Sequence, residues 1–144
     1  MGSIMDLLIK RVHADAVMPT FAHDTDAGLD LCTPVAVMLK AGERAMLPTG
    51  LAMGIPVGYV GLIWDKSGLS NKNGLKSLGG VIDAGYRGEV VVGLLNTSGT
   101  DHTFAAGEKI AQILIQKVEH PTIIEVDDLD ETARGSGAFG STGK

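Results

Sequence analysis

The sequence predicts an all-β sandwich or barrel, and three observations support this fold class. Short apolar or alternating runs rich in Val, Ile and Leu recur along the 144 residues. The 20 glycines and 5 prolines separate these runs at short intervals, a pattern typical of β-sandwiches and barrels. The length suits a single domain with a sizeable core, and no internal repeat or domain linker interrupts it.

Seven segments are predicted as strands, because β-branched and other apolar residues dominate or alternate in them. They are residues 6–12, 35–39, 44–55, 59–64, 89–96, 109–118 and 122–126. Another apparent strand surrounds Asp30. The run from 109 to 118 also fits a helical period, but its isoleucines are β-branched and a proline follows closely, so a strand is favoured.

One short helix and one arm complete the prediction. The helix is expected at 67–74, opened by Ser67 as its cap and closed by Gly74. The last part of the chain is acidic and then glycine-rich, with too little apolar area to offset its ordering entropy. We therefore divide the chain into a β domain, residues 1–126, and a flexible C-terminal arm, residues 127–144.

Composition excludes several classes of function. A net charge of -5 disfavours direct nucleic-acid binding, which needs a basic face. No apolar run approaches the roughly 20 residues of a membrane span, and the charged start does not resemble a signal peptide. Cys32 is the only cysteine, which predicts a buried packing role and a reducing, cytoplasmic compartment. The four histidines are too scattered for a side-chain metal site.

The first two candidate segments combine a carboxylate and a cation. In DAGLDL (26–31), Gly28 permits a tight turn, and Asp30 must be paired or lie at a surface. A plain edge-strand aspartate is the alternative. In DKSGLS (65–70), the amides, the hydroxyl and the ammonium of Lys66, Ser67 and Gly68 form a potential anion site. A simple helix cap with a solvated lysine fits equally well.

The third and fourth segments supply a carboxylate, an aromatic ring, a second cation and an amide. Residues 79–92 are predicted to form a hairpin with a tight turn at DAGYRG. Asp83 ends an apolar run, where a carboxylate can act as a general base. Turn chemistry alone is the alternative for it. Tyr86 follows the turn, and GEKIAQ adds Lys109 and Gln112.

The fifth segment is the tail RGSGAFGSTGK. Arg134 can hold a phosphate in a bidentate fork, Phe139 can stack on a base, and Ser141 and Thr142 can donate hydroxyl groups. The glycine spacing imitates a P-loop, but no lysine follows the second glycine and no βαβ context surrounds it.

These five segments, in this order and at these intervals, resemble the five motifs of the trimeric deoxyuridine triphosphate nucleotidohydrolase (dUTPase) family. GVIDAGYRGE and RGSGAFGSTG are the most specific, and the resemblance runs from about Asp26 to Lys144. It implies a jelly-roll-like β-sandwich of the dUTPase β-clip type. It also implies a homotrimer whose active sites are each built from three chains, with each arm closing a neighbouring site.

The implied activity is hydrolysis of dUTP to dUMP and pyrophosphate with Mg²⁺ on the triphosphate. This reaction limits uracil incorporation into DNA and supplies dUMP for dTMP synthesis. By resemblance, Asp83 activates the attacking water, Gln112 lies near the α-phosphate, and Asp30 holds a water bound to the metal. The implied substrate-binding residues are Lys66, Ser67, Gly68, Gly80, Val81, Ile82, Asp83, Tyr86, Val91, Lys109, Gln112, Arg134, Phe139, Gly140, Ser141 and Thr142.

The sequence departs from the family pattern at three positions. Lys66 and Lys109 stand where arginine is usual, and lysine keeps the charge but loses the planar fork. Ala138 stands where glycine is usual, which narrows the allowed φ range beside Phe139.

Two alternatives stay open. A dCTP deaminase resembles this family in fold and trimeric assembly but needs a catalytic glutamate, and Glu89 is poorly placed for that role. A trimeric regulatory or interaction module could also keep the fold. A nuclear or virus-encoded origin is compatible with the sequence.

Overall fold

The protein is built from antiparallel sheets and one short helix. The structure is a computed structural model that describes residues 5–140, 142 and 143. The strands are β1 (Leu8–Arg11), β2 (Leu29–Cys32), β3 (Val37–Leu39), β4 (Arg44–Gly54), β5 (Tyr59–Trp64), β6 (Leu75–Leu78), β7 (Val81–Ile82), β8 (Glu89–Asn96), β9 (His102–Phe104) and β10 (Lys109–Lys117), and the helix is α1 (Ser67–Asn73). The all-β prediction is confirmed.

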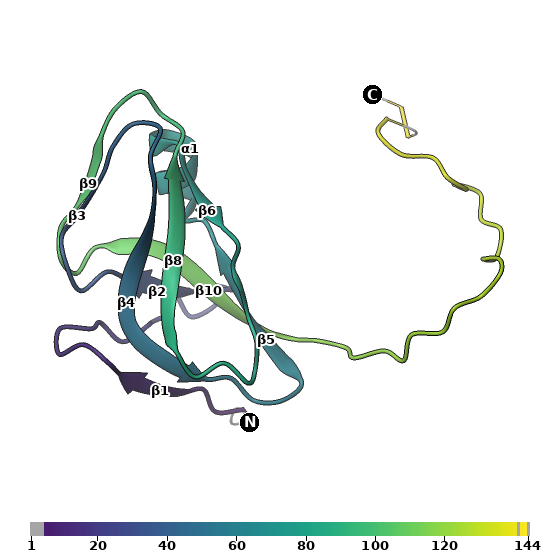
Figure 1. Ribbon diagram of the computed structural model, residues 1–144, viewed down its shortest axis with the longest axis horizontal. Helices are drawn as coiled ribbons and strands as arrows, with labels where there is room; N and C mark the ends of the chain where they lie inside the picture. The colour runs from purple at the N-terminus through teal and green to yellow at the C-terminus, as the bar shows by residue number, and fades with distance from the viewer. Residues whose placement is uncertain (1–4, 141, 144) are drawn as a thin grey trace.

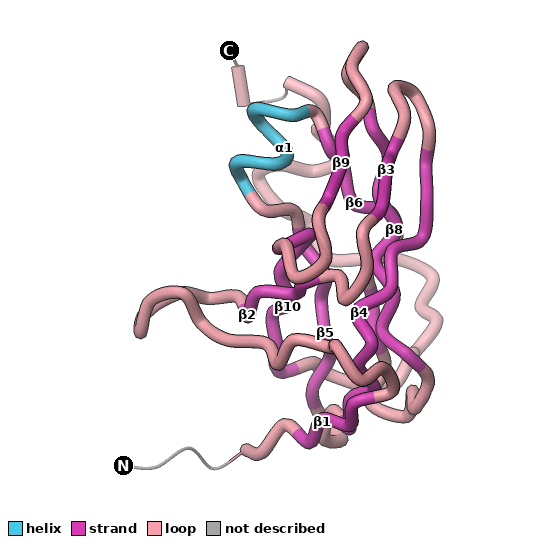
Figure 2. Tube along the Cα trace, turned by 90° about the vertical axis from the view of Figure 1, so that its left-hand side faces the viewer, coloured by secondary structure: helices cyan, strands magenta, loops and turns pink. Residues whose placement is uncertain are grey.

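The strands form two four-stranded sheets and one small ribbon. One sheet has the order β1-β4-β8-β6, the second has the order β2-β10-β5-β7, and β3 pairs with β9. In Figure 1, β10 passes behind β4 and β8, and Figure 2 shows the two sheets as separate layers from the side. Such packing of two antiparallel sheets is a β-sandwich.

The core lies between the sheets and follows from the alternation of side chains along each strand. In β8, Val90, Val92 and Leu94 point inward and are buried, as expected for a strand with one face on the core. Ile113 of β10 and Phe104 of β9 are fully buried against the same cluster. This core supports the strand ends that carry the candidate site residues.

The predicted hairpin at 79–92 is wrong, because its two strands belong to different sheets. β7 pairs with β5, whereas β8 pairs with β4 and β6. The tight turn itself is confirmed, since the Tyr86 amide donates to the Asp83 carbonyl at 3.1 Å. The segment therefore forms a corner that joins the sheets.

The helix is confirmed, but its start differs from the prediction. Lys66, with extended backbone angles, is the cap residue and makes no side-chain capping bond, so Ser67 is the first helical residue. Gly74 ends the helix in the left-handed region, φ 71°, and its amide donates to the Ser70 carbonyl at 3.0 Å. A glycine suits this position because it has no Cβ.

The strand predicted at 122–126 is also wrong. In the described part of the chain, no strand or helix follows Lys117. Ile123 is 87% exposed and Ile124 is 75% exposed, so the apolar residues that suggested a strand have no partner strand to pack beside. Figure 1 shows this segment leading away from the sandwich. Among the described residues, no helix has the length and apolarity to cross a membrane.

Candidate functional site

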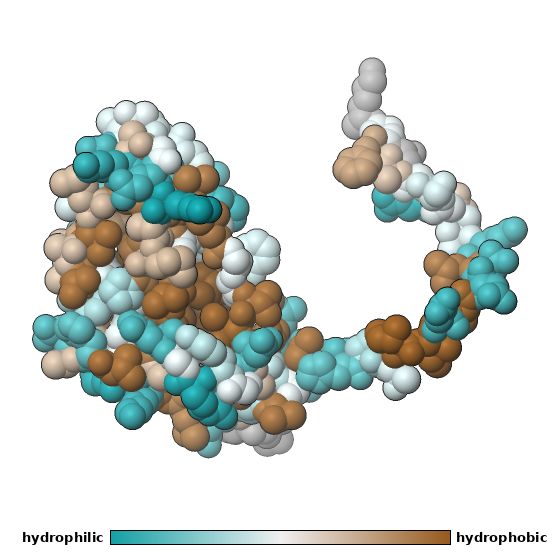
Figure 3. Space-filling model, viewed as in Figure 1, coloured by the Kyte–Doolittle hydropathy of each residue, from teal (hydrophilic) through white to brown (hydrophobic). Residues whose placement is uncertain are grey.

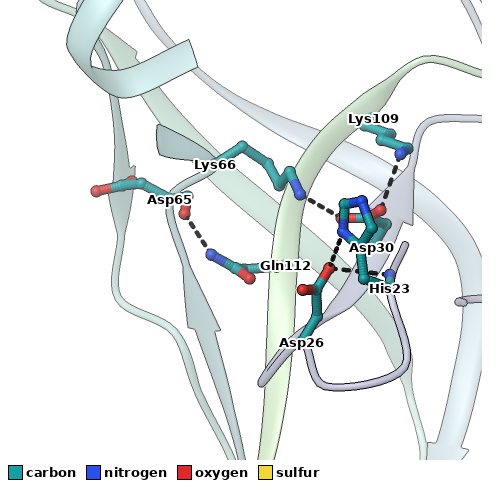
Figure 4. Close-up of polar contacts among 7 residues, drawn as sticks. All are labelled: His23, Asp26, Asp30, Asp65, Lys66, Lys109 and Gln112. Carbon is teal, nitrogen blue, oxygen red and sulfur yellow. Dashed lines mark hydrogen bonds and ion pairs between the residues drawn. The ribbon is translucent and has the colours of Figure 1, made fainter. Parts of the chain in front are cut away.

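Asp30 is the centre of a charged cluster. It lies in β2 opposite Gln112 of β10 and is only 4% exposed. Lys66 Nζ lies 2.5 Å from its Oδ1 and Lys109 Nζ lies 2.9 Å from its Oδ2 (Figure 4). Burial alone would raise the pKa of Asp30, but the two lysines outweigh it and hold that pKa below its ordinary value. Of the two expectations for Asp30, pairing and a surface position, the structure shows pairing, on a strand that is also the edge of its sheet.

The two lysines leave the cluster with a net positive charge. Lys109 extends from the start of β10, and Asp30 raises the pKa of its ammonium group. A shallow hollow of about 360 Å³ lies beside the two ammonium groups. Its lining residues are Lys66, Gly68, Leu69, Lys72, Asn73 and Lys109. Lys72 was not predicted from the sequence, and it adds a third cation on the exposed side of α1.

Gln112 joins this cluster through its amide. Its Nε2 donates to the Asp65 carbonyl at 2.8 Å (Figure 4). A Cβ added to Gly28 would lie 2.2 Å from Gln112 Oε1, so Gly28 is required for the close approach of this side chain. The sequence suggested that Gly28 permits a tight turn. In the structure, a glycine is needed at this position because a side chain would occupy the space of the Gln112 amide.

Asp83 and Tyr86 lie in a second hollow of about 200 Å³. Its lining residues are Val81, Ile82, Asp83, Tyr86, Glu89 and Val91. Asp83 is exposed, and the Tyr86 hydroxyl donates to the Glu89 carbonyl at 2.8 Å. The structure therefore brings five predicted substrate-binding residues together here, beside apolar walls.

Glu89 has a role that the sequence did not reveal. Its Oε2 accepts a hydrogen bond from the Gly50 amide at 2.8 Å. Gly50 has φ 70° and lies where the pairing of β4 with β8 shifts register. An added Cβ would lie 2.8 Å from the Cβ of His13. Glu89 thus ties the Tyr86 turn to an irregular, glycine-dependent part of β4.

Gly80, next to Val81 of the second hollow, has a backbone conformation that favours glycine. Its φ is 117°, and an added Cβ would lie 2.8 Å from the Ile63 carbonyl oxygen. The Ile63 amide donates to the Gly80 carbonyl at 2.8 Å. The backbone here approaches β5 too closely for any side chain.

The two hollows share no lining residue within one chain. The phosphate-binding candidates Lys66, Gly68 and Lys109 line the first, and Asp83 and Tyr86 line the second. A larger hollow of about 750 Å³ lies beside β1 and is lined by Arg87 and the end of β4. It contains none of the candidate site residues.

The described tail residues lie away from the sandwich (Figure 1), and none of them lines either hollow. Phe139 is fully exposed with φ 43°, and the following Gly140 has φ 98°. Arg134 Nε donates to the Gly137 carbonyl at 2.8 Å, so it closes a local turn. Thr142 is exposed, and Ser141 lies outside the described residues. Figure 3 shows apolar side chains along this arm, where Leu129 is 84% exposed.

Cys32 is a buried free thiol next to the cluster. Burial raises the pKa of this thiol, with a further contribution from the charge of Asp30. A thiol with a raised pKa is a poor nucleophile at neutral pH. The predicted packing role is consistent with this environment.

Comparisons with known proteins agree on one family. The dUTPase family matches residues 14–143. The deoxyuridine 5'-triphosphate nucleotidohydrolase of Thermobifida fusca (strain YX) is 47% identical over 138 residues, which cover 94% of this chain and 77% of that protein. The protein of the same name from Arabidopsis thaliana is 44% identical, covering 94% of this chain and 81% of its own length.

Solved structures show the same similarity. A mutant of the Staphylococcus bacteriophage 80alpha dUTPase with dUpNHpp has a TM-score of 0.91 and 30% identity, covering 96% of this chain and 99% of that chain. A mutant dUTPase from phage phi11 of S. aureus, whose structure concerns a structural Mg(II) ion, has a TM-score of 0.81 and 29% identity, covering 86% and 98%. With the family match over nearly the whole sequence, this chain belongs to the dUTPase family.

Proposed function

We propose that this protein hydrolyses dUTP to dUMP and pyrophosphate. The observation that carries the proposal is the pairing of Lys66 and Lys109 with the buried Asp30, beside the Gln112 amide. This arrangement presents fixed cations and an amide to a polyphosphate. Positioned charges of this kind stabilise a phosphoryl transition state without having to reorganise.

Asp83 acts as the general base in this proposal. Its carboxylate accepts a proton from water while the water oxygen forms a bond to the α-phosphorus. The bond from that phosphorus to the bridging oxygen breaks, and pyrophosphate leaves. Gln112 lies near the α-phosphate, and the lysine ammonium groups meet the charge that develops on the phosphoryl oxygens. The exposure of Asp83 in its hollow gives water access to it.

The segment from Gly80 to Val92, which contains the corner, selects the base and the sugar. The backbone N–H and C=O groups of this corner read the polar edge of uracil, and the close approach of Gly80 to β5 leaves no room for a side chain at that position. Tyr86 packs under the deoxyribose and leaves no space for a 2′-hydroxyl. Its hydroxyl bond to Glu89 holds the ring in place. A site that leaves buried polar groups of the wrong base unpaired discriminates strongly.

A homotrimer with shared sites accounts for the separation of the two hollows. The phosphate-binding hollow of one chain and the Asp83 hollow of another would together form one active site. The arm, residues 127–144, would close a site on its neighbours, with Phe139 over the uracil and Arg134 at the γ-phosphate. Two observations support this role of the arm: Phe139 is exposed, and no strand follows Lys117 in the described chain.

Magnesium fits this site only when the substrate supplies most of its ligands. The described residues hold no group of three His, Cys, Asp or Glu side chains suited to a metal. Asp30 Oδ2 is buried without a hydrogen-bond partner, because Lys109 lies at ion-pair distance but outside hydrogen-bond geometry. A water molecule on a metal ion can satisfy that oxygen. Asp30 would therefore hold Mg²⁺ through water, and the ion would neutralise phosphate charge.

The deaminase alternative is disfavoured by Glu89. A proton carrier needs a free carboxylate facing the base, whereas Glu89 accepts a hydrogen bond from the Gly50 amide. The regulatory alternative has a parallel in phage 80alpha dUTPases, which are said to control transfer of virulence genes. Among the described residues, no feature favours that role over hydrolysis.

Pyrophosphate release from dUTP, dCTP, dTTP and UTP, with and without Mg²⁺, tests the proposal. We expect release from dUTP alone among the four, with a requirement for Mg²⁺. Deamination of dCTP or equal turnover of UTP would contradict it. Complete inactivity, with specific nucleotide binding retained, would favour the regulatory module.

A further inference from the structure

We propose that Asp65 is a positioning residue that sets the orientation of Gln112 and Lys66 from outside the substrate site. This inference rests on the proposed dUTP hydrolysis and deepens it. Asp65 lies between the end of β5 and the start of α1. It touches neither hollow, so its effect on catalysis is indirect.

The Asp65 side chain links the two sheets. Its Oδ1 accepts a hydrogen bond from the Ser77 amide and its Oδ2 accepts one from Lys76 Nζ, both at 2.6 Å. Ser77 and Lys76 belong to β6, which lies in the sheet opposite β5. The side chain is only 18% exposed. The Asp65 carboxylate is thus held by two short charge-assisted bonds, one to a half-buried amide and one to an exposed ammonium group.

The Asp65 main chain connects this fixed side chain to the candidate site. Its carbonyl oxygen accepts the hydrogen bond from Gln112 Nε2 at 2.8 Å. The same peptide plane contains the amide nitrogen of Lys66, because the peptide bond is planar. The peptide plane whose carbonyl accepts the Gln112 hydrogen bond therefore also sets the position of the Lys66 amide nitrogen.

Gln112 is constrained on its other side as well. Its Oε1 lies where a Cβ of Gly28 would stand, at 2.2 Å. With Nε2 bound to the Asp65 carbonyl, the amide has one orientation, and the direction of its oxygen is set. A rotation of the peptide between Asp65 and Lys66 would break the hydrogen bond from the Gln112 amide and, at the same time, move the Lys66 backbone. Displacement of catalytic groups by about 1 Å can cost about 100-fold in rate.

Three substitutions separate the contributions of Asp65. Asp65→Ala removes both side-chain bonds. Asp65→Asn keeps an acceptor for the Ser77 amide but loses the ion pair with Lys76. Lys76→Met removes that ion pair from the other side. Asp101→Ala is the matched control, because Asp101 also accepts a backbone hydrogen bond, from Ala41 at 2.9 Å, but bonds to no candidate site residue in the described chain.

Steady-state kinetics with dUTP on the full-length chain tests the proposal, after unfolding temperatures have been measured for each variant. We expect Asp65→Ala to lower kcat/KM by about 10-fold to 100-fold, with KM raised and kcat lowered. Asp65→Asn and Lys76→Met should each lower it by about 3-fold, and the double variant by no more than either alone. Asp101→Ala should keep wild-type kcat and KM.

Wild-type kinetics in a folded Asp65→Ala variant would overturn the positioning role. If Asp65→Ala does not fold, the two milder variants decide, and wild-type kcat/KM in both would overturn it. A wild-type chain that releases no pyrophosphate from dUTP would instead contradict the proposed function itself. The two failures are therefore distinguishable.

Discussion

Lys66 Nζ lies 2.5 Å from Asp30 Oδ1, and Lys109 Nζ lies 2.9 Å from the other oxygen of the same carboxylate. The two positions at which this sequence departs from the arginines usual in the dUTPase family thus meet at one buried aspartate. A carboxylate held by two ammonium groups keeps both cations in place before a polyphosphate arrives. The two lysines act as one unit, with Asp30 as their common anchor.

Substitution of Asp30 by Asn should therefore weaken both folding and substrate binding. The buried amide would leave two ammonium groups unpaired. We expect a loss of about 2 kcal/mol in the free energy of unfolding, below the roughly 3–5 kcal/mol of a fully buried pair because the lysines can turn toward solvent. KM for dUTP should rise. Urea unfolding and steady-state kinetics measure the two effects.

Asp26→Asn is the control for this substitution, because Asp26 is an exposed carboxylate of the same segment, paired with His23. It should change the free energy of unfolding by less than about 0.5 kcal/mol. Equal effects of the two substitutions would show that the Asp30 cluster contributes no special stability.

Replacing Lys109 by arginine should strengthen the binding of the substrate phosphates. A guanidinium group can bind a phosphate with two parallel hydrogen bonds, which an ammonium group cannot do. Lys109 is exposed, so there is room for the longer side chain. We expect Lys109→Arg to lower KM for dUTP by about 2-fold to 5-fold, with Lys117→Arg at the far end of β10 as the control. An unchanged KM would mean that Lys109 does not contact the substrate.

Acid should destabilise the protein partly through Asp65. Burial would raise the pKa of Asp65, but its bonds to Lys76 and Ser77 hold that pKa below the ordinary value of 3.8. A carboxyl group with a lowered folded-state pKa binds fewer protons when folded than when unfolded. Its stabilisation is therefore complete above the ordinary value and is lost as the pH falls through the folded-state pKa.

Urea unfolding of the wild type and Asp65→Asn between pH 3 and pH 7, an interval spanning the carboxyl range, measures this contribution. The wild type should lose more stability than the variant as the pH falls below about 4. Parallel stability curves would contradict the assignment. Asp101→Asn is the control, and its curve should follow that of the wild type.

Asp83→Asn should lower kcat by about 100-fold or more, because general-base catalysis contributes about 10²–10⁴-fold. Binding of dUTP should persist, since the amide keeps the shape of the side chain. Single-turnover kinetics and calorimetry measure the two quantities separately. Near-normal turnover would remove Asp83 from the role of base.

Deletion of residues 134–144 should leave a folded protein that hydrolyses dUTP poorly. Phe139 is fully exposed, and no described residue of the tail is among the core residues or the hydrophobic side chains packed against them, so loss of the tail should not lower the unfolding temperature. Mixed and reassembled with Asp83→Asn chains, the truncated chains should recover part of the activity, because each supplies the part that the other lacks. Unfolding of the truncated chain, or no recovery on mixing, would contradict a shared site.

The sequence predicted the strands with strong patterns and missed those without one. β5 and β8 were predicted residue for residue, because long apolar runs end at turn residues. β6 (LKSL) and β9 (HTF) were not found, since each contributes one fully buried residue, Leu75 and Phe104. A pattern of three or four residues is too short to establish a period.

The candidate site residues were chosen by residue type, and their contacts could not be predicted from the sequence. A carboxylate between two leucines was expected to be paired or to lie at a surface, and Asp30 is paired. The approach of Gln112 to Gly28, and the bonds of Asp65 to β6, depend on how distant segments pack. Sequence spacing alone carries no information about such contacts. The corner at Asp83 shows the same limit, because two consecutive strands form a hairpin only if they pair with each other.

Hydrolysis of dUTP in water enriched in heavy oxygen shows which phosphorus atom the water attacks. We expect dUMP to carry one heavy oxygen atom and pyrophosphate to carry none, because water attacks the α-phosphorus. Mass spectrometry of the two products measures this distribution. A label in pyrophosphate, or the absence of both products, would contradict the account.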